Sequence, residues 1–390
     1  MKLCAISFRE TWQDAEGRWC TAGGFPLQMA AVGSLFSSME LVLLRGGPER
    51  GGLPLPAHAR VVTLRRPTGQ DLRRKMDVLL WLPYYVAMLS RHIRRADVVH
   101  VPLPGDIPLL ALALALLWRK RVVARYGGSW RTNSQTTGVE KLTRWVLRRC
   151  AGGRNVVLAT GHESLPPAPG IRWIFATAVS RRELDAVAPD LDRPIGRPPR
   201  LVFVGRLSPE KGLALLVRTM AALADQDRSA APRLTLIGDG PDRERLEALV
   251  RELGCGELVE LTGQLDRAAL GARLAEADLC VQPSLTEGFS KAWLDAMAYG
   301  VPLVASEIGA ARAVTGSDGD RGWLVPAGDA AALFATLRAA LAGDHDWPAM
   351  RRRCRSYAES HTLERWADEI GQHCTEQWAT PVAPLRPAFP

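Results

Sequence analysis

Two carboxylates lie eight residues apart where a predicted strand, ending at residue 282, gives way to a helix: Glu287 just before the helix and Asp295 inside it. At about 1.5 Å rise per residue they stand about 12 Å apart along the axis, and their directions differ by only about a quarter turn. Two acceptor-only groups so spaced can each hold a pair of hydroxyls at the two ends of an extended ligand. Taken alone, an N-terminal helix charge and a surface aspartate explain the pair equally well.

The start of the same helix offers a second kind of chemistry. The backbone N–H groups around Gly288, Phe289 and Ser290 have no partner inside the helix and carry partial positive charge. Such a terminus suits an anion, for example a diphosphate.

A second strand-to-helix loop, residues 204–212, contains Gly205, Arg206 and Lys211. Arg206 can hold a phosphate through two parallel hydrogen bonds, and Lys211 adds a mobile point charge. The spacing is not that of a P-loop. The alternative for Lys211 is a solvated side chain with no ligand.

A third turn reads Ile237-Gly238-Asp239-Gly240-Pro241. Pro241 suits the first position of a helix, while the glycine spacing is not a dinucleotide fingerprint. In isolation a plain turn explains this sequence better than a ligand site does.

Further candidates follow strands in the first half of the chain. Paired glycines at Gly23-Gly24 and Gly127-Gly128 allow close approach of backbone to a ligand. His100 lies on an apolar strand, where a histidine is more often a satisfied core residue than a catalyst. Tyr126 ends another strand, and His162 precedes Glu163 after a third, where the pair is also explained as a helix cap.

Short apolar runs alternate with longer amphipathic segments along the whole chain. This alternation predicts an α/β protein with parallel sheets covered by helices on both faces. The expected strands cover residues 3–8, 41–44, 61–64, 98–101, 122–125, 156–159, 201–204, 234–237, 259–261, 279–282 and 303–305. The expected helices cover residues 26–37, 71–95, 107–118, 139–149, 213–224, 242–253, 267–275, 290–299, 329–341 and 362–377.

The length of 390 residues suits two domains, and residues 187–200, with four prolines, mark the boundary. We expect a first domain over 1–190, a second over 191–361, a C-terminal helix over 362–380 that returns to the first domain, and a flexible tail over 381–390. Two doubly wound domains of this kind are expected to face each other across a cleft.

The charge is uneven: residues 1–190 hold 27 basic and 14 acidic residues, whereas residues 191–390 hold 23 and 27. A basic half suggests an anionic partner such as a membrane surface, or else solvated helix ends. No nucleic-acid-binding motif is present. Seven cysteines without a CxxC pair favour a reducing compartment, and no signal peptide or membrane span is evident, so we expect a cytoplasmic location.

Arg206 and Lys211, the turn at Gly238–Gly240 and the Glu287 to Asp295 stretch together resemble the family-four retaining glycosyltransferases, group 1 enzymes with the GT-B fold. The resemblance is strongest over residues 200–342. It implies that Glu287 holds donor-sugar hydroxyls, Asp295 the nucleotide ribose, and Arg206 and Lys211 the donor diphosphate.

The remaining candidate roles also come from this resemblance. Gly288, Phe289 and Ser290 would line the donor phosphate, with Gly205, Gly238 and Gly240 in the donor-binding loops. The loops of Gly23-Gly24 and Gly127-Gly128 would lie near phosphate or acceptor in the first domain.

The chain departs from the family at two positions. Asp295 replaces the usual, longer glutamate. Tyr126 occupies the place of a common family histidine, so either Tyr126 makes that contact or His100 or His162 substitutes.

The resemblance implies transfer of a sugar from a nucleotide-diphosphate sugar to a hydroxyl of a glycan or lipid-linked acceptor, with retention and without metal or other cofactor. It places such an enzyme in surface polysaccharide or glycolipid assembly, at the cytoplasmic face of a membrane. The alternatives are a non-catalytic nucleotide- or glycan-binding subunit, and another GT-B enzyme such as a nucleotide-sugar epimerase or a phosphorylase.

Overall fold

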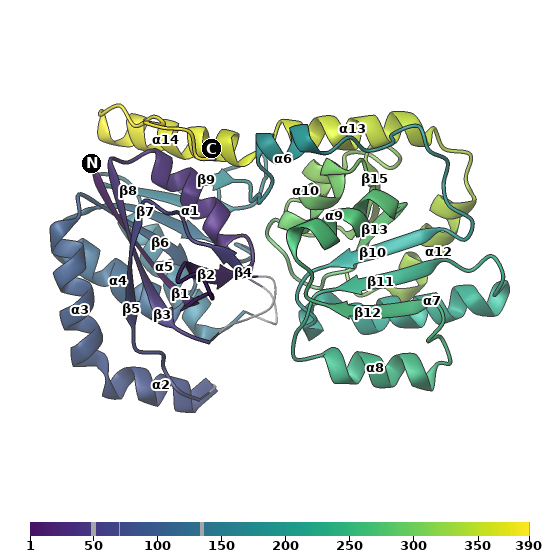
Figure 1. The fold of residues 1–390 in the computed structure, drawn as a ribbon, viewed down its shortest axis with the longest axis horizontal. Helices are drawn as coiled ribbons and strands as arrows, with labels where there is room; N and C mark the ends of the chain where they lie inside the picture. The colour runs from purple at the N-terminus through teal and green to yellow at the C-terminus, as the bar shows by residue number, and fades with distance from the viewer. Residues whose placement is uncertain (48–51, 70, 133–135, 390) are drawn as a thin grey trace. The chain divides into compact units, whose positions relative to one another are not determined.

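A computed structural model describes residues 1–47, 52–69, 71–132 and 136–389 (Figure 1). The chain divides into two compact units: unit 1 comprises Met1–Ala178 and Leu363–Pro390, and unit 2 comprises Val179–Thr362. Each unit is built on a parallel sheet with helices, which confirms the predicted α/β class with two parallel-sheet domains. The cleft expected between the domains stays a prediction.

Over its described residues, unit 1 contains a nine-stranded sheet whose parallel part runs in the order β5, β3, β1, β6, β7, β8, β9. The short strands β2 and β4 add an antiparallel ribbon to the far end of β1. The strands are β1 Lys2–Gln13, β2 Trp19–Ala22, β3 Ser38–Arg45, β4 Gly52–Pro54, β5 Ala59–Leu64, β6 Val98–Leu103, β7 Arg121–Tyr126, β8 Asn155–Thr160 and β9 Ile171–Ile174.

Along the strands of unit 1, apolar side chains point alternately to the two faces of the sheet, and helices cover both faces. Val99, Val101 and Ala124 pack with α3 and α4 on one face, while α1 and α14 contact each other on the other side of the strands. The helices of unit 1 are α1 Phe25–Ser34, α2 Asp71–Leu80, α3 Leu82–Arg95, α4 Asp106–Leu117, α5 Gly138–Cys150 and α14 Leu363–Trp378.

The single helix predicted over 71–95 is two helices. α2 ends at Leu80, Trp81 intervenes, and α3 begins at Leu82 with Pro83 in its first turn. Proline has no backbone N–H to continue an earlier helix but fits a first turn well, so Pro83 sets the break.

Unit 2 contains six parallel strands in the order β12, β11, β10, β13, β14, β15. This is the doubly wound order in which the chain direction across the sheet reverses between β10 and β13. The strands are β10 Arg200–Val204, β11 Arg233–Ile237, β12 Val259–Gly263, β13 Leu279–Gln282, β14 Leu303–Ser306 and β15 Gly322–Val325. The helices are α6 Arg181–Ala186, α7 Leu213–Gln226, α8 Arg243–Glu252, α9 Arg267–Glu276, α10 Lys291–Ala298, α11 Ala311–Thr315, α12 Ala330–Ala342 and α13 Trp347–Glu359, with a 3₁₀ turn η1 at Pro209–Lys211.

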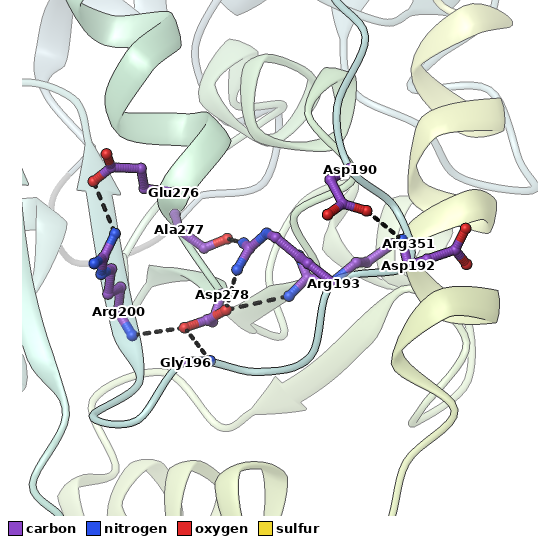
Figure 2. Close-up of polar contacts among 9 residues, drawn as sticks. All are labelled: Asp190, Asp192, Arg193, Gly196, Arg200, Glu276, Ala277, Asp278 and Arg351. Carbon is purple, nitrogen blue, oxygen red and sulfur yellow. Dashed lines mark hydrogen bonds and ion pairs between the residues drawn. The ribbon is translucent and has the colours of Figure 1, made fainter.

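The proline-rich segment that the sequence marks as a boundary lies inside unit 2, because Asp278 fixes it there (Figure 2). The fully buried Asp278 carboxylate accepts hydrogen bonds from Arg193 Nη1 at 2.7 Å and from the backbone N–H groups of Gly196 and Arg200 at 3.1 and 2.9 Å. Arg351 of α13, also buried, approaches the same carboxylate at 3.2 Å. The unit therefore starts at Val179, about twelve residues before the predicted boundary.

The C-terminal segment belongs to unit 1, where α14 packs against α1 and β8. The tail beyond it, predicted to be flexible, is held against α1 over its described residues. Leu385 N–H donates to the Ser34 carbonyl at 2.8 Å, Arg386 donates to the Gly33 carbonyl at 3.2 Å, and Val382 is buried. Pro390 lies outside the described residues.

Across the described ranges, no helix has both the length and the apolar character required to cross a membrane. The apolar segment 107–118 forms most of α4, which turns Ile107, Ala111, Leu112 and Ala115 into the core of unit 1.

Candidate functional site

Three loops of unit 2 meet where the sheet order reverses. Gly205 N–H donates to the Ile237 carbonyl and Leu207 N–H to the Asp239 carbonyl, both at 3.0 Å, which joins the loop after β10 to the loop after β11. Leu285 N–H donates to the Glu210 carbonyl at 2.8 Å and joins the loop after β13. Open α/β sheets bind ligands at this kind of position, so the predicted donor residues share one location.

The glycines of these loops permit backbone-to-backbone contact. A Cβ atom on Gly238 would stand 1.9 Å from the Gly205 carbonyl oxygen, and one on Gly240 would stand 2.2 Å from that of Leu207. Gly238 also has φ of +135°, which side chains rarely adopt. Gly238 and Gly240 therefore let the loop after β11 pack directly against the backbone of Gly205 and Leu207 in the loop after β10.

Lys211 and Glu287 form an ion pair within this cluster. Lys211 Nζ lies 2.6 Å from Glu287 Oε2, and the two side chains are 19% and 14% exposed. Gly212, with φ of +67°, lets η1 approach the Pro283 carbonyl, where a Cβ would stand at 2.1 Å. An ammonium has three N–H donors, so the pair leaves Lys211 able to hold an anion while Glu287 accepts from other donors.

Arg206 extends from the same loop and is exposed. It forms no ion pair with the residues that the structure describes, which leaves its guanidinium available for a phosphate.

The backbone leading into α10 is held from the next loop. Ala310 N–H donates to the Gly288 carbonyl at 2.9 Å, and Gly309 lies so close that a Cβ would stand 2.4 Å from the Glu287 and Gly288 carbonyl oxygens. Phe289 is buried against Trp293. Ser290 is the N-cap of α10 but its side chain makes no capping bond among the described residues, so the helix start keeps its positive character.

Asp295 is held in a network that the sequence did not predict. Its Oδ1 lies 2.8 Å from Arg267 Nη1 of α9, and Arg267 also binds both oxygens of Glu183 on α6. Burial alone would lower the pKa of Arg267, but the two carboxylates raise it overall. Asp295 is only 7% exposed, and its Oδ1 is already paired with Arg267. The predicted contact with the ribose would therefore have to be made by the other carboxylate oxygen, Oδ2.

Glu183 and Arg267 are the site residues that sequence reasoning missed. Glu183 follows the helix cap Ser180 by three residues, and Arg267 follows the cap Asp266. Both therefore look like ordinary helix-start charges in the sequence, and no local signal connects them to Asp295.

The structure places two predicted catalytic residues of unit 1 inside its core. His100 has no exposed surface; its ring Nδ1 lies 3.0 Å from the Val123 carbonyl, and burial lowers its pKa to about 3. Tyr126 is equally buried, with its ring against Trp130, and burial raises its pKa to about 12. Both side chains lie within strands and point into packed layers, so neither is exposed to solvent in this structure.

The other candidates of unit 1 lie at the surface or beside it. His162 is exposed after β8, and its neighbour Glu163 pairs with Arg131 at 3.1 Å. Gly23 has φ of +72° and open space where a Cβ would be, and Gly24 is the N-cap of α1. Of the three groups considered for the family histidine, His162 is the exposed one.

The loop of Gly127 and Gly128 follows the buried Tyr126. Gly127 N–H donates to the Leu103 carbonyl at 2.6 Å, and the Cβ position of Gly128 lies 3.4 Å from the Tyr126 ring. The chain thus folds back over Tyr126 at this loop. Within the described part of the chain, no group of three or more His, Cys, Asp or Glu side chains is arranged to hold a metal ion.

A sequence profile of the family described as glycosyl transferases group 1 matches residues 198–343, which is most of unit 2. The 2-deoxystreptamine glucosyltransferase of Streptomyces kanamyceticus is 29% identical over 246 residues, which are 60% of this chain and 60% of that protein. This chain thus matches about three fifths of the length of that curated relative.

Solved structures extend the likeness to both units. Sucrose-phosphate synthase from Thermosynechococcus elongatus superposes with a TM-score of 0.72 at 19% identity, covering 97% of this chain and 99% of that one. Anabaena HepE in complex with UDP and glucose gives a TM-score of 0.70 at 18% identity, with the same coverage. At this identity the likeness shows the fold, and it confirms the predicted GT-B class; the profile match confirms the group 1 resemblance.

Proposed function

Residues 198–343 form a domain of the glycosyl transferases group 1 family, and from this premise we propose that the chain is a retaining glycosyltransferase. It moves a sugar from a nucleotide-diphosphate sugar to a hydroxyl of a glycan or lipid-linked acceptor, without a metal ion. The observation that carries the proposal is the Lys211–Glu287 ion pair, fixed at the reversal of the unit 2 sheet beside the start of α10.

The chemistry follows from where charge develops. The leaving diphosphate gains negative charge as the bond to the sugar breaks, and Arg206, Lys211 and the amides at the start of α10 supply positive charge to it. Because these groups are held by the packed loops before the reaction, they need little reorganisation during it. The same diphosphate accepts the proton of the incoming hydroxyl, so no protein nucleophile is required.

The carboxylates bind the two sugars of the donor. Glu287 holds hydroxyls of the transferred sugar, oriented by its bond to Lys211. Asp295 holds the nucleotide ribose through Oδ2, while Arg267 binds Oδ1 and fixes the direction of the carboxylate. Arg267 is thus a positioning residue for the donor.

The decisive assay supplies UDP-, GDP- and ADP-sugars together with hydroxyl acceptors and measures nucleoside diphosphate release and product. The proposal expects release that requires both substrates, and a product whose anomeric configuration, read by NMR, matches that of the donor. An inverted product would reject retention, and acceptor-independent conversion of the donor sugar would favour an epimerase.

A non-catalytic subunit is the second candidate, because Tyr126 and His100 are both buried. This reading expects nucleoside diphosphate binding, seen as a thermal shift, with no turnover under any donor and acceptor combination. Turnover that is lost in Lys211→Ala would exclude it.

We propose further that unit 1 contacts the cytoplasmic face of an anionic membrane, in surface polysaccharide or glycolipid assembly. Support comes from α2, where Met76, Leu79 and Leu80 are 60%, 62% and 75% exposed next to the exposed cations Arg73 and Lys75. An amphipathic helix with apolar and basic side chains in solvent suits such an interface.

Vesicle binding tests this placement. Wild type should bind anionic but not neutral vesicles, and high salt should weaken the binding. The variant M76S/L79S/L80S should lose it, whereas Leu117→Ser on α4, which removes another exposed leucine, should keep it. Equal binding of wild type to neutral and anionic vesicles would contradict the proposal.

A further inference from the structure

An open groove with a volume of about 660 Å³ lies along one face of α2, the helix of unit 1 that extends beyond the packed sheet (Figure 1). Its α2 residues are spaced three and four apart, so they share one side of the helix. Met76 and Leu80 on this side are 60% and 75% exposed. The groove is lined by Thr68, Gly69, Arg73, Met76, Asp77 and Leu80.

The loop after β5 forms the other wall of the groove. Gly69 has φ of +79°, and a Cβ there would stand 2.7 Å from the Cβ of Arg73, so only glycine lets the loop pass this close to α2. The Thr68 N–H donates to Asp77 Oδ2 at 3.0 Å and ties the loop to the helix. A fixed backbone therefore shapes the groove.

The groove combines apolar side chains with one positive charge that is not paired. Asp77 accepts hydrogen bonds from Arg65 at 2.6 and 3.0 Å, and this contact, with the Thr68 N–H, lowers the pKa of Asp77 to about 2. The Arg65 guanidinium balances that carboxylate. Arg73 is exposed and forms no ion pair with the side chains that the structure describes. Such a groove suits an amphiphile with a negative group next to a hydrocarbon chain.

Two ion pairs place α2 at the edge of the sheet where this class of fold binds ligands. Arg65 follows β5 directly and holds Asp77 of α2. Arg74 of α2 binds both oxygens of Asp106, just after β6, at 2.8 and 3.1 Å. The strand order of unit 1 reverses between β1 and β6. Open α/β sheets bind ligands outside the carboxyl ends of the strands at such a reversal.

We propose that this groove binds the hydrocarbon chain of the acceptor, with Arg73 at the negative group that follows the chain. The inference rests on the proposed function and selects the lipid-linked acceptor from the two acceptor classes named there. The chain then points from α2 toward the carboxyl edge of the sheet, where the sugar-accepting hydroxyl is expected. A bilayer lipid, the other source of the same chemistry, is an outcome of the test.

Titration calorimetry of the full chain with monomeric dodecyl phosphate, below its critical micelle concentration and without vesicles, tests the groove. Wild type should bind it, and decyl phosphate should bind about 3- to 10-fold more weakly because two fewer methylenes are buried. M76S/L80S should weaken dodecyl phosphate binding about 10-fold or more. Leu79→Ser is the matched control, since Leu79 is 62% exposed on the same helix but does not line the groove. It should keep the affinity within about 2-fold.

The charge is tested separately. Arg73→Gln should weaken dodecyl phosphate binding about 3- to 10-fold but change the binding of uncharged dodecyl maltoside less than about 2-fold. Lys75→Gln, which removes an exposed cation outside the groove, should preserve both affinities. The substituted side chains are exposed, so Tm should remain that of wild type. Absence of binding in wild type, or equal losses in M76S/L80S and Leu79→Ser, would overturn the proposal.

Transfer kinetics distinguish an acceptor chain from a bilayer lipid. Dodecyl glycosides should have KM values at least about 10-fold below those of the matching methyl glycosides, and M76S/L80S should reduce this ratio to about 3 or less. Transfer to chain-free acceptors alone, or the same ratio in wild type and variant, would overturn the acceptor assignment. If wild type binds none of UDP, GDP and ADP, the proposed function fails, whereas dodecyl phosphate binding is measured without nucleotide and is decided separately.

Discussion

Unit 2 and unit 1 share a parallel-sheet architecture but differ in where their polar candidates lie relative to the strands. In unit 2, Lys211 and Glu287 come from loops beyond the strand ends and keep 19% and 14% of their side chains exposed. In unit 1, His100 and Tyr126 lie within β6 and β7 and have no exposed surface. A loop residue can remain available to a ligand, whereas a residue inside a central strand must face one of two packed layers.

The same contrast appears in the charges. Lys211 has a carboxylate partner, Glu287, and lies near the start of a helix. Its charge is therefore paired, but its ammonium is still partly exposed and can bind an anion. Arg125 has no carboxylate partner among the residues that the structure describes, and it contacts the Gln28 amide and the Trp366 ring instead. Unit 2 is thus organised before its ligand arrives, whereas unit 1 retains an uncompensated charge.

The largest effect is expected on kcat, when a substitution removes one of the positive charges at the proposed donor site of unit 2. Lys211→Ala should lower kcat about 10²–10³-fold, because it removes a fixed donor from the developing diphosphate charge. Donor KM should change less, since the interaction strengthens in the transition state. Steady-state kinetics check this, with Arg218→Ala, an exposed charge on α7, as control. Wild-type turnover in Lys211→Ala would remove the basis of the mechanism.

Two substitutions in unit 1 compare the exposed His162, which follows β8, with the buried Tyr126 at the end of β7. His162→Ala should lower kcat roughly 10-fold or more if the exposed histidine assists transfer. Tyr126→Phe should change kcat less than about 2-fold, because its hydroxyl is buried and has no hydrogen-bond partner among the described residues. The opposite ranking in the same assay would mean that Tyr126 moves to the substrate.

Breaking the Asp295 network tests how strongly the donor carboxylate is fixed. Asp295→Asn should destabilise unit 2 by about 2 kcal/mol, less than a fully buried pair because Arg267 is 28% exposed. Urea unfolding measures it. Glu260→Gln, from the exposed pair with Arg273, should cost less than about 0.5 kcal/mol. Equal effects would show that Asp295 is an ordinary surface charge.

The smallest effect concerns acid sensitivity of the unit 1 core. The pKa of His100 is about 3 in the folded chain and near 6.5 when unfolded, so only the unfolded state binds this proton between those values. Its contribution to stability is complete above pH 6.5 and is lost as pH falls toward 3.

Between pH 7.5 and 5.5 this linkage should cost wild type about 1 kcal/mol of unfolding free energy. His100→Gln should reduce that loss, as measured by urea unfolding at the two pH values. An identical pH dependence in both proteins would show that His100 is not held neutral in the core.

Much of the fold follows from sequence pattern, because buried parallel strands appear as short apolar runs and glycine loops mark their ends. The site loops of unit 2 were predictable for the same reason. The helix α13 was missed because its arginines make it look solvated, although Met350, Arg351 and Cys354 face the core. Arg351 is buried there only because Asp278, 73 residues away, receives it.

Long-range partners explain the remaining differences. Arg267 reaches Asp295 across 28 residues and Glu183 across 84, and Asp278 holds Gly196 across 82. No local spacing encodes such contacts. The burial of His100 and Tyr126 follows from the face that each strand presents, which is fixed only once the helices on both sides are in place.

A structure of the full chain with a bound nucleoside diphosphate would show directly where the donor binds. We expect the diphosphate between Arg206 and Lys211, with its oxygens at the backbone N–H groups of 288–290. A diphosphate bound elsewhere in unit 2, remote from a Lys211 that is still paired to Glu287, would rule out the proposed donor site.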